Sequence, residues 1–390
     1  MKRILCWLLI ALSSVVTLDV EANSSYDDRT GSVNVRQTNG SLSGTITIKQ
    51  ASAQKPPKEG FIVVGYATYW DSKMPDPAFL THINYSFAHI KSDFESLDIK
   101  TPSRLTKIVG LKNTYPDLKV LLSVGGWGAG NFSEMAADAS HRAKFCQNCK
   151  NAVQQYGLDG IDLDWEYPTS SEAGISSSPD DTKNFTLLVQ ELRSALGTDK
   201  LLTMASDASA DYVDFVSAGP YLDFINVMTY CMGKPPYHNA GLYPSSMTKR
   251  SCSESVTKHY NAGVPYDKMV MGIPFFGHDG TEEVNFCDIN IGTNTKKWDD
   301  DAKVPYLVNS SGKMVLTYDD AESVGLKASY IKEKDLLGAM YWNIEADDDN
   351  WTLSKTIAAT LLDWEETEEP SADAFLATNQ YVANSLKSRL

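Results

Sequence analysis

Residues 158–167 read Leu-Asp-Gly-Ile-Asp-Leu-Asp-Trp-Glu-Tyr, and in the middle of this run acidic and apolar side chains alternate. On a β-strand this alternation places Asp162, Asp164 and Glu166 on one face, with neighbours about 6–7 Å apart. The apolar residues of the run then point to the opposite face. A solvated acidic face is the simpler interpretation, but the apolar side is too large for an edge strand, and a glycine and a proline bound the run closely. We therefore predict a buried strand whose three carboxyl groups point inward.

Three carboxylates this close together cannot all be ionised, because each negative charge raises the pKa of its neighbours. At least one of the three groups is therefore expected to hold a proton. Groups with perturbed pKa values are concentrated at functional sites, and stability alone rarely explains them. The stretch indicates an active site that combines protonated and ionised carboxyl groups.

Eight β-rich apolar runs, separated by helix-like segments, predict parallel βα units. They cover residues 61–67, 82–89, 119–124, 158–166, 201–206, 224–230, 270–276 and 338–344. Between them, in residues 143–156 for example, apolar side chains recur every four positions, which is typical of a helix. Eight such units predict an α/β fold, a (β/α)8 TIM barrel. We expect the catalytic barrel to span residues 58–365, with a compact α+β insertion at about 279–330 between its seventh and eighth strands.

The ends of the chain differ in composition from the barrel. Lys2 and Arg3 precede a short apolar run, which predicts a signal peptide of residues 1–22 rather than a membrane anchor. Residues 23–57 are rich in Ser, Thr, Asn and Gln and predict a linker with one short strand at 44–49. The C-terminal tail, 366–390, is acidic and then amphipathic. We expect a secreted protein, extracellular or periplasmic, that acts as a monomer.

Charge and cysteine content limit the partners. The 390-residue chain has 35 basic and 50 acidic residues, a net charge of −15, which argues against nucleic acid and anionic membranes and is compatible with a neutral polysaccharide. Removal of the signal peptide leaves five cysteines, so at least one thiol is free or bridges two chains. Cys146 and Cys149 have metal-site spacing, but no second pair completes a zinc site. We interpret them as packing residues or a local disulfide.

The acidic pattern Asp159-x-x-Asp162-x-Asp164-x-Glu166 resembles the signature of family 18 glycoside hydrolases, the chitinases and their relatives. Further segments resemble the family's other motifs in the expected order, so that the resemblance covers residues 61–350. These segments are Ser123-Val124-Gly125-Gly126-Trp127, Met228-Thr229-Tyr230, residues 271–277 and Gly338-Ala339-Met340-Tyr341-Trp342.

The resemblance implies a role for each matching residue. Glu166 is the acid that protonates the glycosidic oxygen, while the 2-acetamido group of the substrate itself acts as the nucleophile. Asp164 orients that acetamido group, Asp162 shares a proton with Asp164, and Tyr230 holds the acetamido oxygen. The substrate-binding candidates are Trp342, as a flat apolar floor, and Tyr66, Phe87, Ser123, Gly126, Trp127 and Met228. The expected substrate is chitin or a chitooligosaccharide, and no metal or organic cofactor is needed.

Two positions depart from the family pattern, which has Asp at position 231 and often Arg at position 278. Here they are Cys231 and His278. Cys231 predicts a cleft with one negative charge fewer and, because like charges raise a carboxyl pKa, a lower pKa for Glu166. A disulfide between Cys231 and Cys252 is the alternative, and it would reshape the loop after the sixth strand.

Other classes of protein remain open at this point. A sugar-binding lectin on the same barrel is one, although the presence of Glu166 favours an enzyme. An endo-β-N-acetylglucosaminidase that cuts N-glycans is another, although the aromatic residues of the predicted insertion favour linear chitin. A non-catalytic structural barrel is the third.

Overall fold

The computed structural model describes residues 29–36, 43–50 and 60–365. The chain divides into two units, residues 1–59 and 60–390. In the first unit, β1 (Arg29–Arg36) and β2 (Ser43–Gln50) pair as an antiparallel hairpin. The sequence predicted one short strand here, which lies within β2, and missed β1. The predicted signal peptide and C-terminal tail lie outside the described residues.

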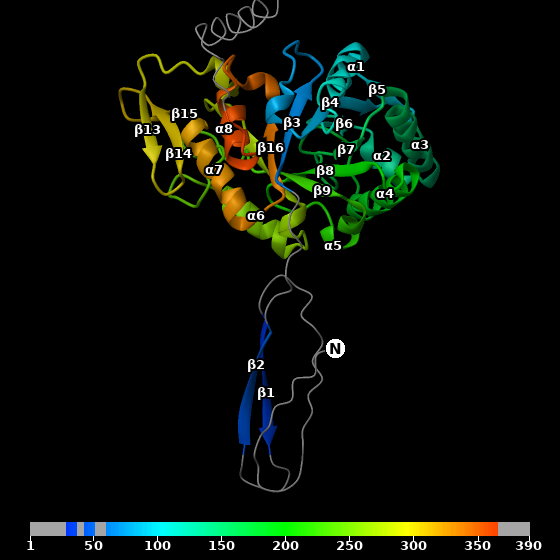
Figure 1. The fold of residues 1–390 in the computed structure, drawn as a ribbon, viewed down its shortest axis with the longest axis horizontal. Coiled ribbons are helices and arrows are strands. Elements are labelled where there is room, and N and C mark those ends of the chain that lie inside the picture. Colours follow the sequence, from blue (N-terminus) through cyan, green and yellow to red (C-terminus); the bar gives the residue numbers. More distant parts are fainter. Residues whose placement is uncertain (1–28, 37–42, 51–59, 366–390) are drawn as a thin grey trace, which may run out of the picture. The chain divides into compact units, whose positions relative to one another are not determined.

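Eight parallel strands of the second unit close into a barrel (Figure 1). They are β3 (Ile62–Thr68), β4 (His82–Ile90), β6 (Lys119–Gly125), β7 (Gly160–Asp164), β8 (Leu201–Asp207), β9 (Phe224–Met228), β10 (Met269–Pro274) and β16 (Gly338–Trp342). Strands that follow one another in sequence are neighbours in the barrel, and β3 closes it by pairing with both β4 and β16. β5 (Leu97–Ile99) is added antiparallel to β4. The predicted TIM barrel is confirmed.

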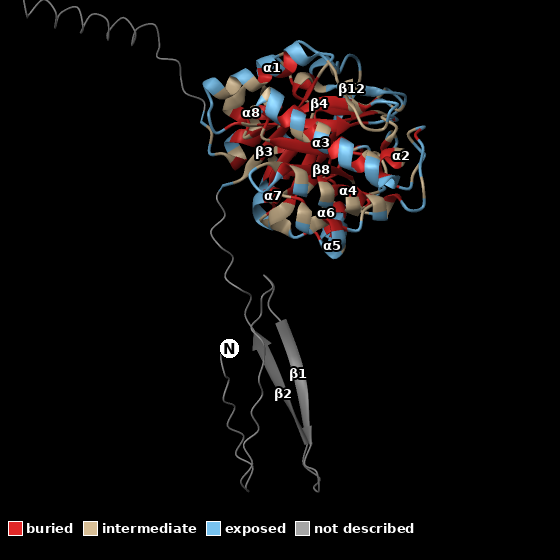
Figure 2. Cartoon of the chain, turned by 90° about the vertical axis from the view of Figure 1, so that its right-hand side faces the viewer, coloured by how far each residue is buried: buried red, intermediate tan, exposed pale blue. Residues whose placement is uncertain are grey.

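Helices cover the outside of the barrel, and their buried sides face the strands (Figure 2). They are α1 (Pro102–Gly110), α2 (Phe132–Ala137), α3 (Ala139–Tyr156), α4 (Asp181–Leu196), α5 (Phe215–Ala218), α6 (Cys252–Asn261), α7 (Ala321–Lys334) and α8 (Thr352–Leu361). Short 3-10 turns are η1 (Pro77–Phe79), η2 (Leu111–Asn113), η3 (Gly219–Tyr221), η4 (Tyr266–Lys268), η5 (Phe286–Asp288) and η6 (Ile344–Ala346). No helix within the described ranges is long and apolar enough to cross a membrane.

Helix α3 illustrates how the sequence sets these elements. The Asp138 side chain accepts hydrogen bonds from the first backbone N–H groups of the helix, and Gly157 ends it in a left-handed conformation. Its apolar stripe includes Phe145, Cys146 and Cys149, all buried in the main core. Both cysteines are free, so they pack in the core and do not form the local disulfide left open by the sequence.

A second sheet is inserted between β10 and β16. Its strands are β11 (Phe276–His278), β12 (Glu283–Asn285), β13 (Thr295–Asp299), β14 (Val304–Val308) and β15 (Met314–Thr317), all antiparallel, in the order β12-β11-β15-β14-β13. The next helix, α7, packs against α8 in the outer ring (Figure 1). The sequence predicted a compact α+β insertion at about 279–330, the end of which overlaps α7; in the structure the five strands of the inserted sheet come first and α7 follows them.

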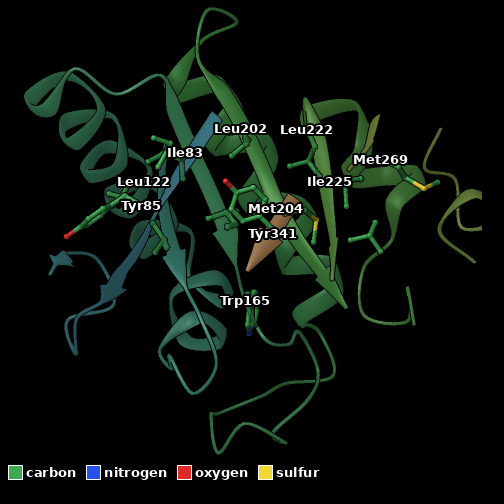
Figure 3. Packing of buried hydrophobic residues seen from close by; sticks show 14 of the residues in the cluster. Ile83, Tyr85, Leu122, Trp165, Leu202, Met204, Leu222, Ile225, Met269 and Tyr341 are labelled. Carbon is green, nitrogen blue, oxygen red and sulfur yellow. The ribbon is translucent and has the colours of Figure 1, made fainter. Parts of the chain in front are cut away.

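Side chains of the barrel strands point alternately outward and inward. The outward residues, Tyr85, Leu122, Met204 and Tyr341 among them, pack beneath the helices (Figure 3). The inward residues include a polar layer, because Ser123, Asp162 and Thr203 lie in register on adjacent strands. Buried polar groups are costly unless hydrogen-bonded, so this layer requires a connected network inside the barrel.

Candidate active site

A cleft of about 550 Å³ lies at the carboxyl ends of the strands, where active sites of this fold are found. It brings together eight residues predicted from the sequence: Tyr66, Phe87, Trp127, Asp164, Glu166, Met228, Tyr230 and Trp342. Three other predicted residues, Ser123, Gly126 and Asp162, are not part of its lining.

Asp162 is completely buried in β7 and accepts four hydrogen bonds. Its Oδ2 accepts from Tyr66 Oη at 2.8 Å and from Ser123 Oγ at 2.7 Å. Its Oδ1 accepts from Thr203 Oγ1 at 2.6 Å and from Asn226 Nδ2 at 3.2 Å. Burial raises the pKa of Asp162, and these donors oppose the shift because they favour the ionised form.

Asp164, two residues further along β7, is 4% exposed and lines the cleft. Burial raises the pKa of Asp164 well above its ordinary value, and the negative charges of Glu166 and Asp162 add to the effect. Asp164 Oδ1 is buried without a hydrogen-bond partner among the described residues. The arrangement favours a proton on Asp164 beside an ionised Asp162, because Asp162 has the donors and Asp164 does not.

Glu166 follows the end of β7 and is partly exposed in the cleft. Burial raises the pKa of Glu166 to about 7, a hydrogen bond from Tyr167 opposes the shift, and the charges of Asp207 and Glu283 add to it. A group whose pKa lies close to neutrality is well suited to give a proton and to take it back. The geometry therefore supports Glu166 as a general acid and base.

Tyr230 lies at the end of β9, and its hydroxyl is 3.8 Å from Met340 Sδ. The pKa of Tyr230 is raised well above its ordinary value, first by burial and then by the charges of Asp164 and other neighbours. The hydroxyl therefore stays protonated and can donate a hydrogen bond to a ligand. Met228, two residues earlier, adds an apolar surface to the same wall.

Aromatic rings form one side of the cleft. The ring centroids of Phe87 and Trp342 are 5.6 Å apart with nearly parallel planes, and Tyr66 lies 5.8 Å from Trp342 in a tilted arrangement. Trp127 also lines the cleft and is 62% exposed, so it is free to contact a ligand. A flat, rigid, apolar surface with a few polar groups beside it is typical of a ligand pocket.

Ser123 and Gly126 support the cleft from behind. Ser123 is completely buried and donates to Asp162, so the structure places it with the acidic pair and not on the ligand surface. Gly126 donates its backbone N–H to the Asp164 carbonyl oxygen at 2.9 Å. A Cβ at this position would lie 2.6 Å from the Phe87 ring.

Several residues that the structure brings to the site were not predicted from the sequence. Thr203 and Asn226 hold Asp162 from within apolar strands, and their inward positions were a signal that could have found them. Asp207, at the end of β8, shares the inward face of Thr203, so the same alternation could have found it. Arg250 and Glu283 line the cleft from a loop and from a strand of three residues, where side-chain periodicity carries no information.

Cys231 lies in the cleft wall in a left-handed conformation, with φ of 54°. Its Sγ is 3.6 Å from Glu283 Oε1. Cys252 is buried and its thiol donates to the Thr229 and Ala240 carbonyl oxygens, so the alternative disulfide is not formed. Cys231 carries no carboxylate, but Glu283 brings one beside it. The effect of Cys231 on the pKa of Glu166 stays a prediction.

His278, the other departure, does not line the cleft and accepts a hydrogen bond from the Gly280 N–H at 2.9 Å. Within residues 60–365, no group of three or more His, Cys, Asp or Glu side chains has the geometry of a metal site.

A TIM barrel with a proton-holding carboxyl cluster beside an aromatic wall defines the class of glycoside hydrolases. The family model "Glycosyl hydrolases family 18" matches residues 62–347, and the chain belongs to this family. The family resemblance stated from the sequence motifs is confirmed.

Relatives of known name agree with this assignment. The chain is 36% identical to Chitinase A1 of Niallia circulans over 68% of its own length and 46% of that protein. It is 30% identical to Chitotriosidase-1 of Mus musculus, covering 70% of this chain and 68% of that one. The chain thus spans about half of the first relative's length.

Solved structures of the family have the same fold. One is a glycoside hydrolase family 18 N-acetylglucosaminidase from Paenibacillus barengoltzii, with 33% identity, a TM-score of 0.71, and coverage of 77% of this chain and 100% of that one. Another is the Group IV chitinase of Ostrinia furnacalis in complex with allosamidin, with 29% identity, a TM-score of 0.71, and coverage of 78% and 99%.

Proposed function

We propose that this protein is a chitinase that hydrolyses β-1,4 bonds between N-acetylglucosamine residues in chitin or chitooligosaccharides. The observation that carries the proposal is Glu166, with its pKa raised to about 7, beside the buried pair Asp162 and Asp164 in a cleft with an aromatic wall. The names of the relatives, chitinases for the most part, support the same substrate class.

The proposed mechanism is retaining and substrate-assisted. Glu166 gives its proton to the glycosidic oxygen as the bond to the anomeric carbon breaks, and the acetamido oxygen of the substrate bonds to that carbon to give an oxazolinium ion. The ionised Glu166 then takes a proton from the water that opens this ring. Two displacements at one carbon retain the β configuration.

The other site residues hold the acetamido group in this mechanism. Asp164, which lines the cleft, accepts a hydrogen bond from the acetamido N–H. Tyr230, kept protonated by burial, donates its hydroxyl to the acetamido oxygen. Asp162 keeps the shared proton on Asp164, because its own oxygens already accept four hydrogen bonds. Trp342 supports the sugar ring.

Export belongs to the proposal as well. Residues 1–22 have the composition of a signal peptide, and residues 23–57 of a linker to the catalytic unit of residues 58–365. We expect cleavage after Ala22 and a monomeric secreted enzyme. N-terminal sequencing and gel filtration of the exported protein test these points.

The test of function is product analysis by mass spectrometry and early NMR spectra after incubation with N-acetylchitooligosaccharides. We expect shorter N-acetylated oligomers, β-anomers first, and no cleavage of fully deacetylated chains, which lack the internal nucleophile. Glu166→Gln should lower kcat at least ~10³-fold with little change in substrate binding. Wild-type turnover by this variant would contradict the assignment, and cleavage of only a high-mannose glycoprotein would identify an endo-β-N-acetylglucosaminidase instead.

A further inference from the structure

Glu283 reaches the cleft from the inserted sheet and not from the barrel. β11 follows β10 almost directly, and β12 pairs with β11 so that Glu283 lies opposite His278. This register places the Glu283 side chain in the lining of the cleft, together with Glu166 and Tyr230. The inserted sheet therefore contributes a carboxylate to the wall of a barrel site.

The contact with Cys231 shows where this carboxylate lies. Cys231 follows Tyr230, and its backbone N–H donates to Asn239 Oδ1 at 2.8 Å, which holds the loop in place. The Cys231 thiol donates to Glu283 Oε1 at 3.6 Å. Glu283 thus occupies the space beside position 231, where the resembled family carries the acidic side chain itself.

Glu283 is an exposed residue, and its carboxylate has few partners from the protein. A thiol is a poor hydrogen-bond donor, and among the described residues it is the hydrogen-bond partner found for the Glu283 side chain. No ion pair within the described part of the chain joins Glu283 to Lys, Arg or His. Arg250 lines the same cleft but forms no ion pair with Glu283. A carboxylate with free acceptor capacity in a sugar cleft is suited to receive hydroxyl groups, and hydrogen bonds to a charged acceptor are the stronger kind.

The charge of Glu283 also acts on the catalytic groups. It raises the pKa of Glu166 and, further down the order of causes, that of Tyr230. The residue is thus placed to affect both the binding of a sugar and the protonation of the acid.

We propose that Glu283 is a substrate-positioning residue, whose carboxylate accepts hydrogen bonds from hydroxyl groups of the sugar bound against Tyr230, in the role that Cys231 cannot fill. This inference rests on the proposed glycosidase function. On this inference the inserted sheet is part of the binding site. A carboxylate at either position 231 or position 283 can then accept the hydrogen bonds of the sugar.

The test compares kinetics of four proteins on an N-acetylchitooligosaccharide over a range of pH. They are the wild type, Glu283→Gln, the control Glu282→Gln, and the double variant Cys231→Asp with Glu283→Gln. Glu282 is exposed and outside the cleft lining, so the control makes the same chemical change one residue away. Thermal unfolding of each protein establishes that it is folded.

Glu283→Gln should lower kcat/KM about tenfold, mainly through KM, because a charged acceptor for the sugar is lost. The alkaline limb of its kcat profile should move to lower pH, because a negative charge near Glu166 is removed. Glu282→Gln should match the wild type. The double variant should recover several-fold in kcat/KM and regain the alkaline limb, since the aspartate introduced at position 231 returns a carboxylate to the same place.

Two outcomes would overturn the inference. One is a Glu283→Gln protein that matches the Glu282→Gln control in both KM and pH profile. The other is a folded double variant with no recovery, which would show that Glu283 acts through the fold of the inserted sheet. Failure of the proposed function is distinguishable, because the wild type itself would then leave the oligosaccharide intact.

Discussion

Gly126 shows how a residue without a side chain can shape a sugar site. Its φ of 96° lies where L-residues are strained, and a Cβ there would lie 2.6 Å from the Phe87 ring. Phe87 in turn stacks on Trp342, the expected floor for the sugar. The absence of a side chain at position 126 therefore leaves room for the Phe87 ring, which stacks on Trp342.

We expect Gly126→Ala to raise KM for chitooligosaccharides about tenfold, because the new methyl group displaces Phe87 and with it the stacked Trp342. Gly128→Ala is the matched control: Gly128 also has a positive φ, of 79°, but the nearest atom to its Cβ would be 3.7 Å away. Steady-state kinetics and melting temperatures of both variants check this. Equal KM values in the two would show that backbone strain, and not the contact with Phe87, is responsible.

The sequence was sufficient for the residues that a regular strand carries. Alternation placed Asp162, Asp164 and Glu166 on one face of a strand; the structure has Asp162 and Asp164 in β7 and Glu166 two residues beyond its end, where it lines the cleft with Asp164. It was insufficient for Glu283, because its position depends on the register of β12, a strand of three residues. Alternation of apolar and polar side chains cannot be recognised in three residues, so the contact between Glu283 and Cys231 could not be predicted from the sequence.

At the scale of elements, a buried ion pair joins the inserted sheet to helix α7. Asp319 follows β15, and Lys327 lies in the second turn of α7. Both carboxylate oxygens of Asp319 lie 2.6 Å from Lys327 Nζ. Asp320 caps the same helix together with Ser323, and the Ser323 hydroxyl also donates to Asp319. Both charged side chains are almost completely buried, so each depends on the other for satisfaction.

We expect Lys327→Met to lower the free energy of unfolding by about 3–5 kcal/mol, because it leaves Asp319 buried without its partner. Adding Asp319→Leu to this variant should restore much of the loss, since no buried charge then remains. Lys334→Met, an exposed change on the same helix, should cost less than about 1 kcal/mol. Urea denaturation measures all three. A Lys327→Met protein as stable as the Lys334→Met control would contradict the expected cost of leaving Asp319 without its partner.

The elements of the barrel were predictable because each strand is a run of five or more residues between turn residues, and each agrees with the βα repeat. The pairing of β11 with β12 was not, because these strands have only three residues each and their pairing is set by tertiary contacts. The predicted insertion, at about 279–330, overlaps the first part of helix α7. The packing of α7 against α8 could be known only from the structure.

The whole molecule is acidic, with a net charge of −15, and its active site places carboxyl groups where burial disfavours ionisation. Such groups bind protons more tightly in the folded protein than in the unfolded chain. For Glu166 the folded pKa is about 7, against an ordinary value of 4.5. A pKa raised by folding contributes stability that is fully present below the unfolded value and is lost as the pH rises through the folded value.

Between about pH 5 and pH 8 the ionisation of Glu166 should therefore lower the free energy of unfolding by about 2–3 kcal/mol. Glu166→Gln cannot ionise, so the variant should gain stability relative to the wild type with rising pH: the difference between them should be about 2–3 kcal/mol more favourable to the variant at pH 8 than at pH 5. Urea denaturation at each pH measures this, with Glu282→Gln as a control that should follow the wild type. If wild type and Glu166→Gln lose stability in parallel, the Glu166 charge is not opposed by burial, and the assignment of a raised pKa to the acid fails with it. The proposed reaction requires Glu166 to ionise at each turnover, and burial in the folded protein disfavours this ionisation.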